Sequence, residues 1–278
     1  MVKNGAPVYP NNSLLQTALE AALSAGKAIM GIYNTDFEVA YKNDMSPLTL
    51  ADLTADKIIN EYLSFTGIPV ISEESENVEY ARRQFWEMLW MVDPLDGTKE
   101  FVRRSDEFTI NIALIIKQKP VMGVVYAPAT GEMYFGMESL GSFFTRIDLG
   151  DATLVHSSAN IISNSKKLPL TIAPGEFIVQ ASRSHRDAET RRFTDKLKQL
   201  HPDLRIVVRG SSLKLCAVAE GTCQIYPRFG PTMEWDTAAG HAIIELAGGQ
   251  VTDAKNDLPL VYNKKSLLNP DFIAKRLD

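Results

Sequence analysis

The chain has 278 residues, of which 45% are hydrophobic and 23% charged, so it suits one large domain or two intimate ones and is not globally disordered. Lysine and arginine total 29 against 34 aspartates and glutamates, and this formal net charge of -5 argues against a binder of nucleic-acid polymers. A small anionic ligand stays open, because local cations or bound metal ions can reverse the field within one cleft.

The chain has only two cysteines, Cys216 and Cys223, which is too few for a disulfide scaffold and fits a reducing compartment. Residues 1–10 contain no apolar core of a secretory signal. No uncharged apolar run approaches the roughly 20 residues that span a bilayer. We therefore expect a soluble, cytoplasmic protein without an integral membrane segment. Nothing in the sequence indicates an anchor for peripheral association with the inner membrane.

The first 160 residues predict two helices followed by a meandering sheet, an α+β order. Apolar residues at helical spacing indicate a helix over 13–32 with Ser13 as its cap. Residues 49–52 have the pattern of a capping box that opens a second helix through Leu63. Short β-rich runs separated by Gly, Pro or charged turns follow at 69–72, 89–92, 110–116, 121–126, 133–135 and 142–145.

A stretch rich in Ser, Lys and Pro at 160–175 separates this half from an alternating second half. The second half has the pattern of a small α/β layer. Its expected strands are 177–181, 205–208, 224–226 and 250–252, and its expected helices are 188–200, 212–220 and 237–246. The sequence thus predicts an α+β half over 1–160 and a smaller α/β half over 161–278.

The segment 93–98 (DPLDGT) places two aspartates three residues apart, directly after an apolar strand. Pro94 fixes φ and Gly97 permits a tight turn, so both carboxylates and the Leu95 carbonyl can face one point. Oxygen ligands of this kind suit Mg²⁺, and the amides of Gly97 and Thr98 can face an anion. The same residues are common turn formers, so a plain β-turn is an alternative interpretation of this string taken alone.

Further acidic residues lie at the ends of predicted elements. Glu73 and Glu74 follow a strand, Asp236 opens a helix, and Asp52 is the third residue of the capping box. Each has an ordinary explanation by itself, as a loop carboxylate, a helix cap or a capping-box member. Their shared position at element ends, where sites are built, favours one acidic site.

Taken together, residues 93–98 and 235–240 (WDTAAG) resemble the inositol monophosphatase superfamily of metal-dependent, lithium-sensitive phosphatases. The two motifs are specific in this order and spacing, and the resemblance runs from about Ser13 to Gly249. It implies a layered αβαβα sandwich of the sugar-phosphatase type. The metal-binding and catalytic residues would lie in 1–160, and 161–278 would complete the metal site and bind the substrate.

Longer strings narrow the resemblance to one branch, the CysQ type or 3'(2'),5'-bisphosphate nucleotidases. They are 96–101 (DGTKEF), 182–185 (SRSH), 210–214 (GSSLK) and 226–236 (YPRFGPTMEWD). Inositol monophosphatases usually carry Thr-Asn where this chain has Lys99 and Glu100.

The resemblance implies two Mg²⁺ ions and allows a third, weaker one near Glu73. The ligands of the first ion would be Glu73, Asp93 and the Leu95 carbonyl. Those of the second would be Asp93, Asp96 and Asp236, with Asp93 bridging. Glu73, rather than Glu74, aligns as the ligand.

Thr98 and Asp52 resemble the pair that orients the attacking water and accepts its proton, and Glu73 counts with them as catalytic. A threonine hydroxyl is a poor base, so Asp52 has to supply the proton sink. Substrate contacts are implied for Glu73, Leu95, Asp96, Gly97, Thr98, His185, Ser211, Lys214, Arg228 and Asp236. For Lys214 a solvated helix position stays open, and for His185 a loop cap.

The implied activity is Mg²⁺-dependent removal of the 3'-phosphate of adenosine 3',5'-bisphosphate, in sulfur assimilation and nucleotide recycling. Its sulfated precursor is a second implied substrate. Inositol phosphate or fructose 1,6-bisphosphate is the alternative substrate, and a non-catalytic metal-binding protein is the second alternative. The partner would be a small phosphorylated nucleotide rather than a nucleic-acid polymer, and the protein a monomer or homodimer.

Overall fold

The computed structural model describes residues 10–41, 47–75, 78–147, 158–170, 176–182 and 188–277. Within these ranges the strands form two large sheets and one short pair, β1 (Val39–Tyr41) with β2 (Pro47–Thr49). None of the helices described is long and apolar enough to cross a membrane.

The larger sheet has seven strands in the order β3-β4-β5-β6-β7-β8-β9. β3 and β4 are parallel and the other neighbours are antiparallel, as the meandering pattern predicted. The bounds are β3 (Val70–Ser72), β4 (Met88–Asp96), β5 (Thr109–Ile116), β6 (Lys119–Ala127), β7 (Glu132–Met137), β8 (Gly141–Arg146) and β9 (Lys166–Lys167).

The smaller sheet has five strands in the order β11-β10-β12-β14-β13. β10 is parallel to β11 and β12, whereas β14 is antiparallel to both of its neighbours. The bounds are β10 (Ile178–Ser182), β11 (Arg205–Arg209), β12 (Ile225–Arg228), β13 (Gly249–Asp253) and β14 (Phe272–Arg276).

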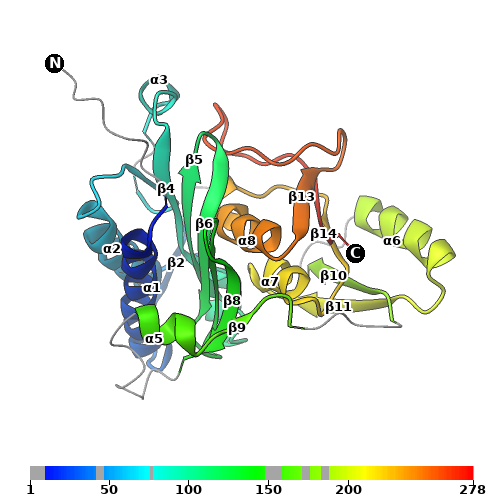
Figure 1. Cartoon of the computed structure of the whole chain (residues 1–278). Helices are drawn as coiled ribbons and strands as arrows, with labels where there is room; N and C mark the ends of the chain where they lie inside the picture. Colours follow the sequence, from blue (N-terminus) through cyan, green and yellow to red (C-terminus); the bar gives the residue numbers. More distant parts are fainter. Residues whose placement is uncertain are drawn as a thin grey trace.

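Helices and sheets alternate in five layers (Figure 1). α1 (Asn12–Tyr33) and α2 (Leu50–Ser64) cover the outer face of the larger sheet, α7 (Leu213–Glu220) and α8 (Glu234–Leu246) lie between the sheets, and α6 (Ala188–Leu200) lies outside the smaller one. The short helices are α3 (Tyr80–Arg83), α4 (Thr98–Val102) and α5 (Ser158–Ser163). The predicted αβαβα sandwich is confirmed.

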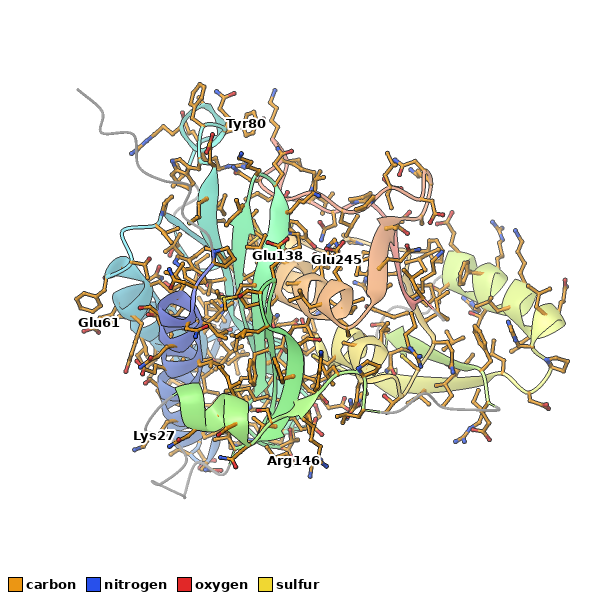
Figure 2. All side chains as sticks on the ribbon, viewed as in Figure 1. Lys27, Glu61, Tyr80, Glu138, Arg146 and Glu245 are labelled. Carbon is orange, nitrogen blue, oxygen red and sulfur yellow. The ribbon has the colours of Figure 1, made fainter. Side chains whose placement is uncertain are left out.

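Apolar side chains form one core on each face of the larger sheet. One lies between this sheet and helices α1 and α2, and the other between the sheets around α7 and α8. Side chains fill both spaces, whereas charged residues such as Lys27 and Glu61 lie on the outer surface of the helices (Figure 2). Burial of these two faces is the main stabilising contribution to the fold.

Three of the differences between predicted and observed boundaries concern a helix cap or the ends of elements that carry acidic residues. Helix α1 is capped by Asn11, whose side-chain oxygen accepts a hydrogen bond from the Leu14 amide at 3.1 Å, so the prediction of Ser13 as the cap was wrong. Helix α8 begins at Glu234 instead of 237, and β4 continues past Val92 to Asp96. The capping box of Thr49 and Asp52 is confirmed.

The division of the chain at residue 160 stays a prediction. The larger sheet ends with β9 (Lys166–Lys167), which pairs with β8, and α5 contacts α1.

Gly123 on β6 allows α8 to approach the larger sheet closely. A Cβ atom there would lie 2.3 Å from the carbonyl oxygen of Ala239 on α8. We therefore expect Gly123→Ala to displace the helix and lower the free energy of unfolding by about 1–3 kcal/mol, as overpacking of a core does. Urea denaturation measures this change.

Gly31→Ala is the matched control, because Gly31 lies in α1 and a Cβ atom there would meet nothing within 4 Å. Alanine in a helix is favoured over glycine, so this variant should gain up to about 1 kcal/mol. Equal effects of the two substitutions would contradict the tight contact.

Candidate active site

Carboxylates from four segments converge near the C-terminal ends of the parallel strands β3 and β4. Asp52 lies in the first turn of α2, Glu73 follows β3, and Asp236 lies in the first turn of α8. Asp93 and Asp96 lie at the end of β4, where the pairing with β5 is irregular between them. This irregularity accommodates Pro94, which cannot donate to a sheet ladder.

Glu73, Asp93 and Asp236 form a group that can hold a cation. One carboxylate oxygen from each lies within 4.8 Å of the others. Burial raises the pKa of Asp93 well above its usual range, and the neighbouring carboxylates raise it further. Burial and the charge of Asp96 raise the pKa of Asp236 to about 8. Oxygen ligands that repel one another in this way fit a divalent ion such as Mg²⁺, which would neutralise them.

Asp96 and Gly97 join the two halves of the site. The Asp96 carboxylate accepts hydrogen bonds from the hydroxyls of Ser211 and Ser212 at 2.7 and 2.9 Å. Gly97 has a φ of 91°, which favours glycine, and a Cβ atom there would lie 3.3 Å from the Cβ of Ser211. The turn after β4 therefore packs directly against the segment that precedes α7.

Thr98 and Asp52 form a hydrogen-bonded pair beside the carboxylate group. The Thr98 hydroxyl donates to Asp52 Oδ1 at 3.0 Å. Asp52 Oδ2 accepts from the amide and the hydroxyl of Thr49 at 2.7 and 2.6 Å. Burial raises the pKa of Asp52, while these hydrogen bonds act in the opposite direction. The arrangement leaves the lone pairs of Thr98 Oγ1 available to accept a hydrogen bond from a water molecule.

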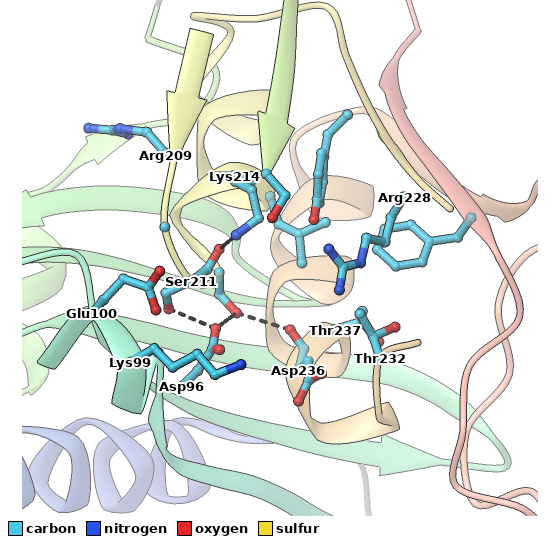
Figure 3. Close-up of a pocket in the computed structure, with 17 residues that line it drawn as sticks. Asp96, Lys99, Glu100, Arg209, Ser211, Lys214, Arg228, Thr232, Asp236 and Thr237 are labelled. Carbon is cyan, nitrogen blue, oxygen red and sulfur yellow. Dashed lines mark hydrogen bonds between the residues drawn. The ribbon is translucent and has the colours of Figure 1, made fainter. Parts of the chain in front are cut away.

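A cavity of about 140 Å³ opens beside Asp96 and Asp236 (Figure 3). Lys214 and Arg228, both buried, line its wall opposite α4. The Lys214 ammonium donates to the Ser211 carbonyl, and the Arg228 guanidinium donates to the Pro231 carbonyl at 3.0 Å. Nε of Arg228 has no hydrogen-bond partner in the described part of the chain. An acidic end and a cationic end therefore face one cavity.

The structure brings most of the predicted site residues together, while their roles stay predictions. Lys214 is buried, so the solvated helix position considered for it is wrong. His185 lies outside the described residues. Glu74 does not belong to the acidic group formed by Glu73.

Sequence reasoning overlooked two contributors to the site. Ser212 supports Asp96, and the Asn111 amide donates to the Ser212 hydroxyl at 2.9 Å. The side chain of Lys99 lines the cavity next to Asp96. Ser212 belongs to the motif 210–214, but its function is apparent only from its hydrogen bond to Asp96 on the larger sheet.

One family model matches residues 11–277, almost the whole chain. The chain belongs to the inositol monophosphatase family. The resemblance inferred from the two motifs is thereby confirmed. This family is metal-dependent, which agrees with the acidic group at the end of β4.

Curated relatives within the family are named 3'(2'),5'-bisphosphate nucleotidase CysQ. The protein from Salmonella typhimurium is 43% identical over 263 residues, which are 93% of this chain and 98% of that protein. The protein from Escherichia coli K12 is 42% identical over 264 residues, with the same coverage of 93% and 98%. The crystal structure of CysQ from Bacteroides thetaiotaomicron has a TM-score of 0.88 and 45% identity, covering 95% of this chain and 97% of that one.

The raised pKa of Asp236 gives a pH dependence that can be measured. In the metal-free protein this carboxyl binds its proton more tightly when folded, so its contribution to stability is present below the ordinary pKa of 3.8 and is lost as the pH rises to about 8. We expect Asp236→Asn in EDTA to be more stable than wild type, by an amount that grows between pH 5 and 8. The upper limit is about 1.4 kcal/mol per pH unit.

Urea unfolding at several pH values checks this result, with Mg²⁺ added in a parallel series. Mg²⁺ should stabilise the wild type and reverse the order of the two proteins, because a ligand that binds only the folded state stabilises it. A difference that does not change with pH would contradict the shifted pKa.

Proposed function

We propose that the chain is a Mg²⁺-dependent phosphatase that removes the 3'-phosphate of adenosine 3',5'-bisphosphate and releases AMP and phosphate. The observation that carries the proposal is one cavity lined by Asp96 and Asp236 at one end and by two buried cations, Lys214 and Arg228, at the other. Asp236 also belongs to the carboxylate group with Glu73 and Asp93. A metal site suits the phosphate that reacts, and the cations suit a second phosphate that does not. The names of the CysQ relatives support this substrate.

Two Mg²⁺ ions would be held by the residues that the family resemblance implies. Glu73, Asp93 and the Leu95 carbonyl would hold one, and Asp93, Asp96 and Asp236 the other, with a third ion near Glu73 as a weaker addition. Bound Mg²⁺ supplies neutralisation of the carboxylates and of the phosphate, and it favours in-line displacement.

Thr98 and Asp52 would prepare the attacking water. Because Thr98 Oγ1 donates to Asp52, it can accept a hydrogen bond from water and orient the water oxygen toward phosphorus. As the new P–O bond forms, a water proton passes through the Thr98 hydroxyl to Asp52. The bond to the ribose 3'-oxygen breaks, and this oxygen takes a proton from a solvent water molecule to become the 3'-hydroxyl of AMP, while Asp52 returns its proton to solvent. The raised pKa of Asp52 makes it a stronger base than an ordinary aspartate.

The wall of the cavity opposite α4 would bind the 5'-phosphate. Arg228 offers a planar guanidinium that can grip phosphate through two hydrogen bonds, and Lys214 offers a point charge. Ser211, held by Asp96, lies between the two ends of the cavity. The sulfated precursor of the bisphosphate carries the same 3'-phosphate and is included in the proposal as a second substrate.

A phosphate-release assay tests the proposal. The panel contains adenosine 3',5'-bisphosphate, its sulfated precursor, inositol 1-phosphate and fructose 1,6-bisphosphate, each with EDTA, with Mg²⁺, and with Mg²⁺ plus Li⁺. We expect the bisphosphate to have the highest kcat/KM, with no turnover in EDTA and inhibition by Li⁺. A preference for inositol phosphate would overturn the nucleotide assignment. Metal binding without turnover of any substrate would overturn the proposal that the chain is a phosphatase.

Arg228→Ala separates the two phosphates of the substrate. We expect kcat/KM for adenosine 3',5'-bisphosphate to fall by the equivalent of about 2–4 kcal/mol, as when one partner of a desolvated charge pair is truncated. The value for 3'-AMP, which has only the reacting phosphate, should change by no more than a few-fold. Binding to a non-reacting group helps to position the reacting one.

Arg191→Ala is the matched control, because Arg191 is exposed on α6 and does not line the cavity. Equal losses on both nucleotides in Arg228→Ala would mean that Arg228 supports the fold or the metal site. Inositol phosphate would then again be a candidate substrate.

A further inference from the structure

Lys99 places an ammonium group at the acidic end of the cavity. It is the second residue of α4 and follows Thr98 directly. Its side chain is exposed and lines the cavity together with Asp96 and Asp236. Figure 3 shows it extending past Asp96 in the direction of Asp236, on the side opposite Lys214 and Arg228.

The other cations around this cavity already have protein partners. Lys214 donates to Ser211 and lies 5.7 Å from the centre of the Tyr226 ring. Arg228 donates to a backbone carbonyl, and Arg209 lies 3.6 Å from Glu132. Within the ranges that the structure describes, no hydrogen bond or ion pair of the Lys99 ammonium is found. A cation in a binding cavity without a protein partner is available to an anionic ligand.

The charge balance of the proposed reaction indicates which anion the Lys99 ammonium would bind. The carboxylates of Glu73, Asp93, Asp96 and Asp236 carry four formal negative charges, which two divalent ions would neutralise. A phosphate monoester brings a further charge of about -2 near neutral pH. Lys214 and Arg228 lie at the other end, where the non-reacting phosphate would bind. Lys99 is therefore the cation placed to balance the reacting phosphate.

We propose that Lys99 is a catalytic residue whose ammonium contacts a non-bridging oxygen of the phosphoryl group that is transferred. This inference rests on the proposed function and deepens it. Lys99 stays protonated and transfers no proton, while the water oxygen binds phosphorus and the bond to the 3'-oxygen breaks. Its contribution is to stabilise the charge on the equatorial oxygens in the transition state.

The experiment compares Lys99→Met with Arg103→Met. Arg103 directly follows α4, is exposed and does not line the cavity, so its replacement removes the same charge from the same region without touching the site. We expect Lys99→Met to lower kcat/KM on the order of 10²-fold for both adenosine 3',5'-bisphosphate and 3'-AMP, in the range for loss of one preorganised charge donor. Arg103→Met should stay within about twofold, and Lys99→Arg should recover part of the rate because it keeps the charge.

Inorganic phosphate provides a readout that does not depend on turnover. Isothermal titration calorimetry in the presence of Mg²⁺ should show that Lys99→Met binds phosphate at least about tenfold more weakly than the wild type, a difference of about 1.4 kcal/mol. Mg²⁺ affinity in the absence of phosphate should not decrease. A structural role for Lys99 would change the unfolding temperature and leave phosphate affinity per folded molecule unaltered.

Three results would overturn the inference. A loss confined to the bisphosphate would place Lys99 at the 5'-phosphate, an equal loss in Arg103→Met would show a long-range field effect, and unchanged phosphate affinity would exclude contact. Failure of the proposed function is distinguishable, because the wild type would then cleave a different phosphomonoester or none. An equal loss of kcat/KM in Lys99→Met on whichever phosphomonoester is cleaved would still support the contact of Lys99 with the reacting phosphate. So would a loss of phosphate affinity in a protein that cleaves none.

Discussion

Asp93→Asn is expected to lower kcat on the order of 10³-fold or more, even at saturating Mg²⁺. The carboxylate belongs to the group with Glu73 and Asp236 and is proposed to bridge both ions, so the loss of one charge weakens both metal sites. Asparagine has nearly the same shape and keeps the oxygen that accepts the Leu95 amide hydrogen bond at 3.1 Å. The loss should therefore reflect chemistry and not a change of fold.

Unfolding measurements separate these two explanations for Asp93→Asn. Burial and neighbouring carboxylates raise the pKa of Asp93, so removing its charge should raise the unfolding temperature of the metal-free protein at neutral pH. Added Mg²⁺ should then stabilise the variant less than the wild type. The control is Glu87→Gln, an exposed carboxylate just before β4. Activity of Asp93→Asn within about tenfold of wild type would contradict the proposal that Asp93 bridges the two metal ions.

Local sequence signals predicted the elements that carry the site. The capping box of Thr49 and Asp52 is formed within four residues, and its hydrogen bonds are the ones that the pattern indicates. The apolar run 110–116 is β5, which is buried along nearly its whole length between α1 and α8. Signals of this kind depend only on residues that are close in the chain, so a single sequence is sufficient to predict the elements.

Elements that depend on distant partners were mispredicted or missed. Pro94 and Gly97 predict a turn after Val92, but β4 continues because Asp93 pairs with Asn111 and Asp96 with Thr109. Strand β14 was not expected at all, although it lies between β12 and β13 inside the smaller sheet. Its five residues acquire their strand conformation by pairing with the strands on both sides, and no local sequence signal predicts them.

The start of α8 shows how a site residue can have a structural function as well. Asp236 was expected as the cap before a helix over 237–246, but it is the third residue of the helix, and its carboxylate accepts a hydrogen bond from the Met233 amide at 2.9 Å. Glu234 is fully buried and accepts hydrogen bonds from the backbone amides of Asn263 and Lys264. Acidic residues in the first helical turn are stabilising in any protein, so their number alone could not separate a ligand from a cap.

Assembly of the site required contacts between residues about one hundred positions apart. Ser211 and Ser212 donate to Asp96, and the Gly210 amide donates to the Glu107 carboxylate at 3.0 Å. The motifs before α7 therefore have two tasks, which are to hold a proposed metal ligand and to shape the cavity. Sequence reasoning proposed only the second task, because the spacing between these segments carries no information on distance.

Thr98→Ala is expected to reduce kcat by roughly 10²–10⁴-fold, the range for loss of a general acid–base element, while Mg²⁺ affinity is retained. The hydroxyl donates to Asp52 Oδ1 at 3.0 Å and is not itself a proposed metal ligand. Thr98→Ser should keep most of the activity, because serine can make the same hydrogen bond. Single-turnover kinetics measure the chemical step, and isothermal titration calorimetry measures Mg²⁺ affinity.

The same variant tests the link between Thr98 and Asp52. The Thr98 hydrogen bond lowers the pKa of Asp52 against the effect of burial, so its removal should raise that pKa further. The rate that remains in Thr98→Ala should therefore require a higher pH than the wild-type rate, because Asp52 acts as a base only when ionised. Asp52→Asn combined with Thr98→Ala should lose little more than either substitution alone, since residues that act as one unit are not additive. If Mg²⁺ affinity fell together with the rate, Thr98 would be structural and the proton path to Asp52 would be wrong.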